Sequence, residues 1–195
     1  MSRNKILVTV FLLGTIAFTA MMTFYVGPRM MAVRQDVAFD KHFYKCQKVL
    51  SASELEIQLR GWERPNTHPV FPVRLAGVNA PPLGDPQDSA LIAWSERNEV
   101  DPERAALMAE AGQRTLMAFI RKQNLILETL DGQRAGVSLA PGELVHVYVS
   151  GTQVNRKLLA SGLAFLDPET AGDYLDLYRK EGQQAQENSQ GLWAN

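Results

Sequence analysis

A run of 21 residues without a charge, residues 6–26, constrains this chain more than any other feature of its sequence. As a helix the run would be about 31 Å long, close to the hydrocarbon thickness of a bilayer. Arg3 and Lys5 precede it, and Gly27-Pro28-Arg29 follows it. No face of such a helix would be polar, which argues against a buried helix of a soluble domain. The run therefore predicts one N-terminal transmembrane helix.

A cleaved signal peptide is the alternative to an anchor, and its apolar region is usually about 7–15 residues long and ends in small residues. The run at 6–26 is longer, and bulky residues close it at 24–26. We therefore expect a single-pass membrane anchor that stays in the mature protein. Basic residues flank it on both sides in similar number, so the positive-inside rule gives little preference for either orientation. The shorter piece, residues 1–5, is the easier one to keep in the cytoplasm, which favours a domain on the non-cytoplasmic side.

The remaining chain divides into a stalk and a soluble domain. Residues 27–41 are mixed and lack a sustained apolar face, which is typical of a stalk. Residues 42–195 carry 15 Lys and Arg against 19 Asp and Glu, a net charge of −4. Nucleic-acid backbones are bound by clustered Lys and Arg. The charge therefore disfavours nucleic acid as a partner, and a protein partner is expected.

The single cysteine and the histidines give no metal site. Cys46 excludes an intramolecular disulfide and a thiolate cluster, and it is expected to be a small buried side chain. His42, His68 and His146 share no metal-ligand spacing, and His146 on a strand is expected to be a satisfied surface or core residue. No metal and no cofactor are therefore expected.

The domain shows an α+β order of strand and helix signals. In residues 53–60, Leu55, Ile57 and Leu59 alternate with polar residues, as in a half-buried strand. Pro72 predicts an edge or a bulge, and the Pro-rich residues 79–86 predict a loop. The strands are expected at 43–50, 53–60, 70–78, 124–130 and 143–150.

Three helices are expected between and after these strands. Asp101-Pro102-Glu103 is a helix start, with a cap acceptor and proline at the first helical position, and the helix runs to about 122. Thr152 is expected to cap a short helix that ends at 161–162. Asp167-Pro168-Glu169 repeats the start signal for a last helix that runs to about 188. Five short antiparallel strands with three helices favour a small Greek-key barrel.

Several strings in this order resemble the thermonuclease, or staphylococcal nuclease-like, family. They are Val-Arg-Leu-Ala-Gly-Val-Asn-Ala-Pro at 73–81, Ala-Glu-Ala at 109–111, Val-Asn-x-x-Leu-Leu-x-x-Gly-Leu-Ala at 154–164, and Gly-Leu-Trp at 191–193. The resemblance covers about 44–195, with an insertion near 84–102. It implies a five-stranded OB-fold β-barrel with three α-helices, here preceded by the transmembrane helix.

The chemistry that the resemblance implies is calcium-dependent cleavage of phosphodiesters. The first metal-binding aspartate of the family falls at about Ser53, and the second falls at Asn79, which keeps an oxygen but loses the charge. The general-base glutamate falls at Pro82, and its side chain cannot ionise. Arg74 retains the first phosphate-binding arginine, whereas the second falls at Gly142.

One of these five charged positions survives, so the resemblance implies a catalytically degenerate member that acts as a binding or scaffold module. Loss of one oxyanion donor alone costs roughly 100- to 1,000-fold in rate. The alternative is a membrane-tethered, calcium-dependent nuclease with a rearranged site, in which Asp85, Asp88 and Arg134 replace the missing groups.

Arg74 and Asn79 are the candidate ligand-binding residues. Arg74 could instead form a structural ion pair with a glutamate, and the candidates are Glu54, Glu56 and Glu110.

Four further residues are placed by the sequence. Trp62 and Trp94 are expected in loops, where they could mark a binding surface or pack. Asn155 and Trp193 are expected to be structural: the Asn155 amide should satisfy backbone groups of a neighbouring segment, and the Trp193 ring should cover the barrel or a helix.

Overall fold

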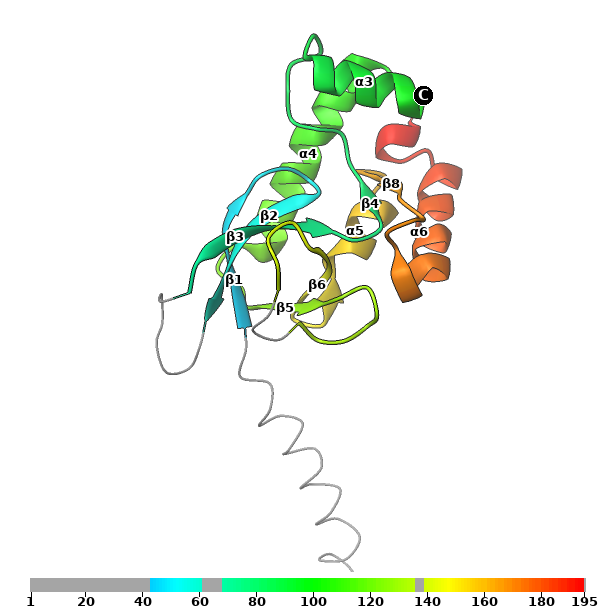
Figure 1. Cartoon of the computed structure of the whole chain (residues 1–195). Helices are drawn as coiled ribbons and strands as arrows, with labels where there is room; N and C mark the ends of the chain where they lie inside the picture. The colour runs from blue at the N-terminus through cyan, green and yellow to red at the C-terminus, as the bar shows by residue number, and fades with distance from the viewer. Residues whose placement is uncertain (1–42, 61–67, 136–138, 195) are drawn as a thin grey trace, which may run out of the picture. The chain divides into compact units, whose positions relative to one another are not determined.

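Five strands close into a barrel in the computed structural model, which describes residues 43–60, 68–135 and 139–194 (Figure 1). The barrel strands are β1 (Phe43–Val49), β2 (Glu54–Arg60), β3 (Val70–Leu75), β5 (Leu125–Glu128) and β6 (Leu144–Val149). Their order is β3-β2-β1-β5-β6, with antiparallel neighbours. A parallel pairing of Arg74 with Leu144 and Leu75 with Val145 closes the ring. The fold is therefore mixed α+β with a closed five-strand barrel, consistent with an OB-fold.

The predicted tail, transmembrane helix and stalk lie outside the described residues. Residues 42–195 form a compact unit of their own. Within the described ranges, no helix is both long enough and apolar enough to cross a bilayer.

The alternating apolar side chains of β2 point into the barrel, as the sequence predicted. Leu55 and Ile57 are fully buried and Leu59 almost so. Pro72 lies at the edge of β3, as predicted, ahead of the pairing with β6 that begins at Arg74, and its carbonyl accepts from the Gly142 N–H at 2.7 Å.

The strand predicted over 70–78 is in fact two strands. β3 ends at Leu75, the chain turns at Gly77, and β4 (Val78–Asn79) pairs with β8 (Phe165–Leu166) in a separate two-stranded sheet. Gly77 has φ +70°, and a Cβ there would come within 2.5 Å of the Tyr178 ring. The turn therefore requires glycine, and it carries β4 away from the barrel.

Four α-helices, not three, lie in the described part of the chain: α3 (Ser89–Asn98), α4 (Pro102–Ile120), α5 (Val154–Ala160) and α6 (Leu175–Glu187). The start of α4 is confirmed, because Asp101 Oδ2 accepts from the Arg104 N–H at 3.0 Å. The additional helix, α3, falls in the stretch treated as an insertion, where the sequence predicted a loop. Trp94 therefore lies in a helix and not in a loop.

Two predicted helix starts are wrong. Thr152 belongs to a short strand, β7 (Thr152–Gln153), and α5 begins after it without a side-chain cap. The last helix begins at Leu175, after the 3₁₀ turn η2 (Gly172–Tyr174). The Asp167 carboxylate instead accepts from the Glu169 N–H and the Thr170 hydroxyl, so it closes a turn.

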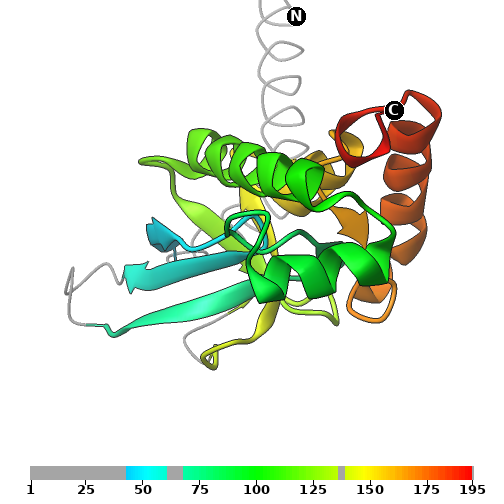
Figure 2. The ribbon, with the colours of Figure 1, turned by 90° about the horizontal axis from the view of Figure 1, so that it is seen from above.

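The helices gather on one side of the barrel (Figures 1 and 2). α4 packs against β1 and α5, and α5 packs against β6 and α6. α3 lies at the N-terminal end of α4 and shares with it a second small core, formed by Leu91, Trp94, Ala105 and Leu192 (Figure 1). The last of these residues comes from the C-terminal 3₁₀ turn η3 (Gly191–Trp193).

Candidate functional site

The position matched to the first metal ligand, Ser53, lies in the turn between β1 and β2. Its N–H donates to Ser51 Oγ at 3.2 Å, and the two hydroxyl oxygens are 3.4 Å apart. α4 holds this turn closely, since a Cβ on Gly112 would lie 2.6 Å from the Cβ of Ala52. Gln113 Nε2 also donates to the carbonyl of Val49 at 3.2 Å. The turn is packed and hydrogen-bonded, and its side chains carry no charge.

Asn79, at the end of β4, hydrogen-bonds to α3 through both polar atoms of its side chain. Its Oδ1 accepts from Trp94 Nε1 at 2.7 Å, and its Nδ2 donates to Asn98 Oδ1 at 3.0 Å. Asn98 Nδ2 in turn donates to the carbonyl of Trp94 at 2.7 Å. We call these three residues the Asn79 network. It joins the candidate ligand-binding residue to a helix that the sequence did not predict.

The residues after Asn79 offer no proton acceptor. Ala80 and Pro81 are buried, and Pro82 is half-buried. Neither alanine nor proline has an ionisable side chain, so this segment provides neither a metal charge nor a general base.

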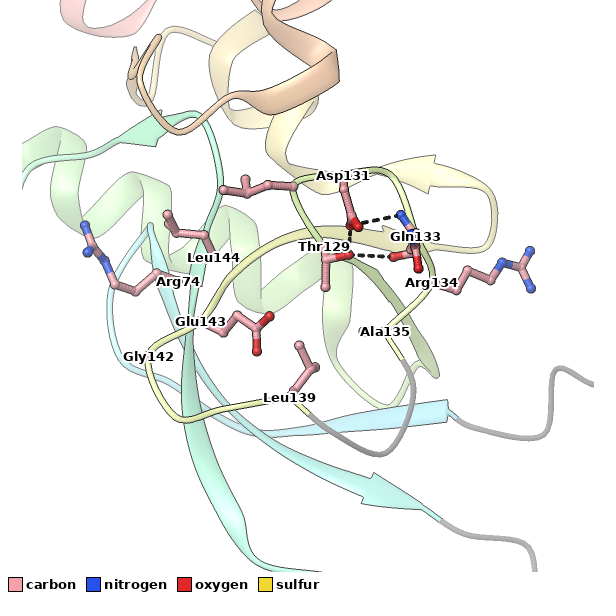
Figure 3. A pocket seen from close by; sticks show the side chains of 11 residues that line it. Arg74, Thr129, Asp131, Gln133, Arg134, Ala135, Leu139, Gly142, Glu143 and Leu144 are labelled. Atoms are coloured by element: carbon pink, nitrogen blue, oxygen red, sulfur yellow. Dashed lines mark hydrogen bonds between the residues drawn. The ribbon is translucent and has the colours of Figure 1, made fainter.

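Arg74 is exposed and lines a pocket of about 740 Å³ at the end of β3 (Figure 3). The remaining lining comes from the segment that joins β5 to β6 and from the start of β6: Thr129, Leu130, Asp131, Gln133, Arg134, Ala135, Leu139, Gly142, Glu143 and Leu144. Among the described residues, Arg74 makes none of the three predicted glutamate pairs, and Glu110 pairs with Arg114 instead. The guanidinium therefore stands at the rim of a pocket with no carboxylate partner in the described ranges.

The second arginine position, Gly142, lies in the same pocket. The glycine has φ +81°, a left-handed conformation in which any other L-residue is strained, although nothing lies within 4 Å of the place of a Cβ. Backbone conformation, and not lack of space, therefore disfavours an arginine here. The structure brings Arg74 and Gly142 to one pocket, whereas Ser53, Asn79 and Pro82 are absent from its lining.

Two carboxylates in the pocket accept hydrogen bonds from neighbouring residues of the segment that joins β5 to β6. Glu143 Oε2 accepts from the Ala140 N–H at 2.7 Å. Asp131 accepts from the Thr129 hydroxyl and from the Gln133 N–H, and the bond from Thr129 is the main reason that the pKa of Asp131 lies below its usual value. With both arginines of the lining, the pocket carries mixed charge.

The groups that could rebuild a nuclease site are not brought together. Asp88 caps α3, since its Oδ1 accepts from the Ala90 N–H at 2.8 Å. Asp85 lines a different pocket, with Glu110 and Arg114 among its neighbours. Arg134 lines the Arg74 pocket but extends outward on the opposite side (Figure 3). In the described ranges, no three His, Cys, Asp or Glu side chains are placed to share a metal ion.

A buried polar cluster joins the barrel to α6, and the sequence did not predict it. His146 is fully buried, as one of the two predicted environments required, and its Nδ1 lies 2.8 Å from the Tyr178 hydroxyl. Burial lowers the pKa of His146 to about 4, so the ring is neutral at neutral pH. The Tyr148 hydroxyl donates to that of Tyr174, which donates to Glu128 Oε2, each at 2.7 Å. The tyrosine hydroxyls are thus bonded within the cluster, whereas His146 Nε2 is buried without a hydrogen-bond partner among the described residues.

Comparison with known proteins agrees with the fold. The family model described as "Staphylococcal nuclease homologue" matches residues 72–195, which runs from β3 to the C-terminal end and is more than half of the chain. No curated protein matches the chain. The first two barrel strands, β1 and β2, precede the matched range. The structure shows that they belong to the same barrel, because β2 pairs with β3. On the family match and the closed barrel together, the chain belongs to the staphylococcal nuclease family.

Proposed function

We propose that this protein is a membrane-anchored, non-catalytic member of the staphylococcal nuclease family that acts as a binding or scaffold module. One observation carries the proposal: the two polar atoms of Asn79, which stands at a cation-binding position of the family, are both bonded to α3. Both polar atoms of the Asn79 side chain are held by α3, and its uncharged amide oxygen is a poor ligand for a hard cation and cannot act as a base.

The other positions support the same conclusion. Phosphodiester hydrolysis needs a base for the water, and it needs positive charge for the phosphate oxygens. A hard cation that supplies this charge is held by several carboxylate oxygens. Ser53 and Pro82 provide none, and of the two arginine positions only Arg74 remains.

The partner that fits this domain best is a protein. The domain carries a net charge of −4, which gives no general attraction to a nucleic-acid backbone. The Arg74 pocket offers mixed charge beside Leu139 and Leu144, a combination typical of protein surfaces that bind other proteins. Residues 6–26 would hold the domain at the membrane, on its non-cytoplasmic side.

One observation favours the second candidate, a tethered calcium-dependent nuclease. Arg74 remains exposed at the rim of a large pocket, without a carboxylate partner in the described ranges, so it is available to an anionic ligand.

A nuclease assay distinguishes the two candidates. The full chain in detergent is incubated with single-stranded DNA, double-stranded DNA and RNA, in calcium or in chelator. We expect no cleavage above that of a mock preparation. Arg74→Ala is the matched control, because contaminating nuclease would survive this substitution. Cleavage that needs calcium and disappears in Arg74→Ala would establish the nuclease instead.

A further inference from the structure

The hydrogen bonds of the Asn79 network have a direction that chemistry fixes. The indole of Trp94 can only donate, so the atom of residue 79 that faces it must accept. Asn98 uses its Nδ2 on a backbone carbonyl, which can only accept, so its Oδ1 is the atom that faces Asn79. Residue 79 must therefore accept with one atom and donate with the other. A neutral amide does both, whereas an ionised carboxylate cannot donate.

The network is shielded by packing against β8. Trp94 is only 8% exposed, and its ring stacks on Phe165 with centroids 5.7 Å apart and planes 12° apart. Phe165 is also the cross-strand neighbour of Asn79, and its ring meets that of Trp193 edge to face at 4.7 Å. Leu91 is fully buried on the same helix. Asn79 and Asn98 are half-buried, so water could replace a lost partner only in part, and the loss would carry a cost.

We propose that α3 is a cover over position 79 whose seating requires a neutral amide at this position. A carboxylate at this position places two acceptors against the network, one of them facing Asn98 Oδ1, so the charged residue and the seated helix exclude each other. The inference rests on the proposed function in one respect, namely that residue 79 stands where the family's second cation ligand would be. It adds that α3 closes this position, and that restoring the acid would release the helix.

Limited trypsin digestion of the full chain in detergent tests the seating of α3. Arg97 lies in this helix, and cleavage after it requires the helix to open, so the rate of the 98–195 fragment's appearance reports the open population. We expect Asn79→Asp to raise this rate about tenfold, as the loss of one half-buried hydrogen bond would. Ser53→Asp adds the same charge outside the network and should leave the rate at the wild-type value. An unchanged rate in Asn79→Asp, or an equal rise in Ser53→Asp, would overturn the proposal.

A second variant removes one bond without adding charge. Trp94→Phe keeps an aromatic ring against Phe165 but deletes the indole N–H that Asn79 accepts. We expect cleavage after Arg97 to accelerate while cleavage in α6, after Arg179, stays slow. If Asn79→Asp unfolds the whole domain, trypsin cuts quickly after both Arg97 and Arg179 in that variant. Trp94→Phe then decides the question. No faster cleavage after Arg97 in Trp94→Phe would show that the Asn79 network does not hold α3 in place.

Calcium tests directly whether a cation at position 79 and the seated helix α3 exclude each other. In the triple variant Ser53→Asp, Asn79→Asp, Pro82→Glu, millimolar calcium should speed cleavage after Arg97 further, because the ion and the seated helix compete for residue 79. Protection of Arg97 by calcium would mean that both fit together, and the proposal would fail. Nuclease activity in the wild-type chain would refute the proposed function and leave these digestion results unaffected, so the two failures are distinguishable.

Discussion

Asn155 shows how one buried amide can join segments that are distant in the sequence. The residue is fully buried, its Oδ1 accepts from the Val147 N–H at 2.8 Å, and its Nδ2 donates to the carbonyls of Ala76 at 2.9 Å and Val145 at 3.1 Å. It therefore connects α5 to β6 and to the turn that follows β3. The sequence-based expectation of a structural amide that bonds backbone groups is confirmed.

Replacing Asn155 with Ala should lower the free energy of unfolding by about 2–4 kcal/mol, because the Val147 N–H and the Ala76 carbonyl lose a buried partner, whereas the Val145 carbonyl keeps the Ala76 N–H. Chemical denaturation measures the change. Gln183→Ala, on the exposed face of α6, is the control and should be neutral. An Asn155→Ala domain as stable as the control would show that water enters and replaces the amide.

His146 gives the domain a dependence on pH. Its pKa is about 4 in the folded domain and near 6.5 when unfolded, so folding favours the neutral ring. This contribution is fully present above pH 6.5 and is lost as the pH falls from about 6.5 towards 4. The wild-type melting temperature should fall over this window more steeply than that of His146→Phe, in thermal melts at several pH values. Parallel curves would exclude His146 as the cause.

At the scale of single residues, the sequence predicted which residue types occupy the family's site positions better than it predicted their hydrogen-bond partners. The substitutions at positions 53, 79, 82 and 142 can be read directly from the motif strings. That Asn79 bonds to Trp94 cannot be, because the two meet only after a turn at Gly77, a strand pairing and a helix have formed. The buried tyrosine bonds around His146 depend in the same way on the packing of α6 on the barrel.

At the scale of elements, strands and the long helix were predicted closely, and the helix α3 was missed. Pro81, Pro82, Gly84 and Pro86 precede it, and they favour a loop reading of the whole stretch. A start signal was present in Asp88, which does cap the helix. The error at Asp167 has the opposite cause, since its carboxylate caps a turn rather than a helix. Local signals name a capping residue without saying which structure it caps.

Two glycines inside helices provide a matched prediction about packing. Gly112 of α4 lies against Ala52, and an added Cβ would come within 2.6 Å of the alanine Cβ, whereas nothing lies within 4 Å of one at Gly182 of α6. Gly182→Ala should therefore stabilise the domain by about 0.5–1 kcal/mol through helix propensity. Gly112→Ala should destabilise it despite the same gain in propensity. Thermal melts of the two variants settle the matter, and a stabilising Gly112→Ala would mean that α4 can shift away from the β1–β2 turn.

At the scale of the whole molecule, the net charge of the domain leads us to expect little affinity for nucleic acid. The described surface belongs to a domain of net charge −4, and Arg74 and Arg134 extend on opposite sides of their pocket (Figure 3). We expect single-stranded DNA to bind only weakly at physiological salt. Fluorescence anisotropy with a labelled oligonucleotide measures it, and submicromolar binding with a steep salt dependence would contradict the expectation.

The proposed membrane anchor can be tested on the whole chain. If residues 6–26 remain as a membrane helix, the mature protein keeps its full N-terminal segment. Intact mass measurement of the protein extracted from membranes should give a chain that still includes residue 6. A mature chain that begins between residues 20 and 30 would establish a cleaved signal peptide.

The parallel pairing between β3 and β6 has a consequence for how the chain is made. β3 is complete once residue 75 has left the ribosome, but its barrel partner does not exist until residue 149 has been synthesised. Throughout that interval the nascent chain displays an unpaired strand edge, and β1 likewise waits for β5. Unpaired edges are templates for association with other chains. Chains that stop before β6 should therefore aggregate, whereas chains that extend beyond it have the strand that covers the edge.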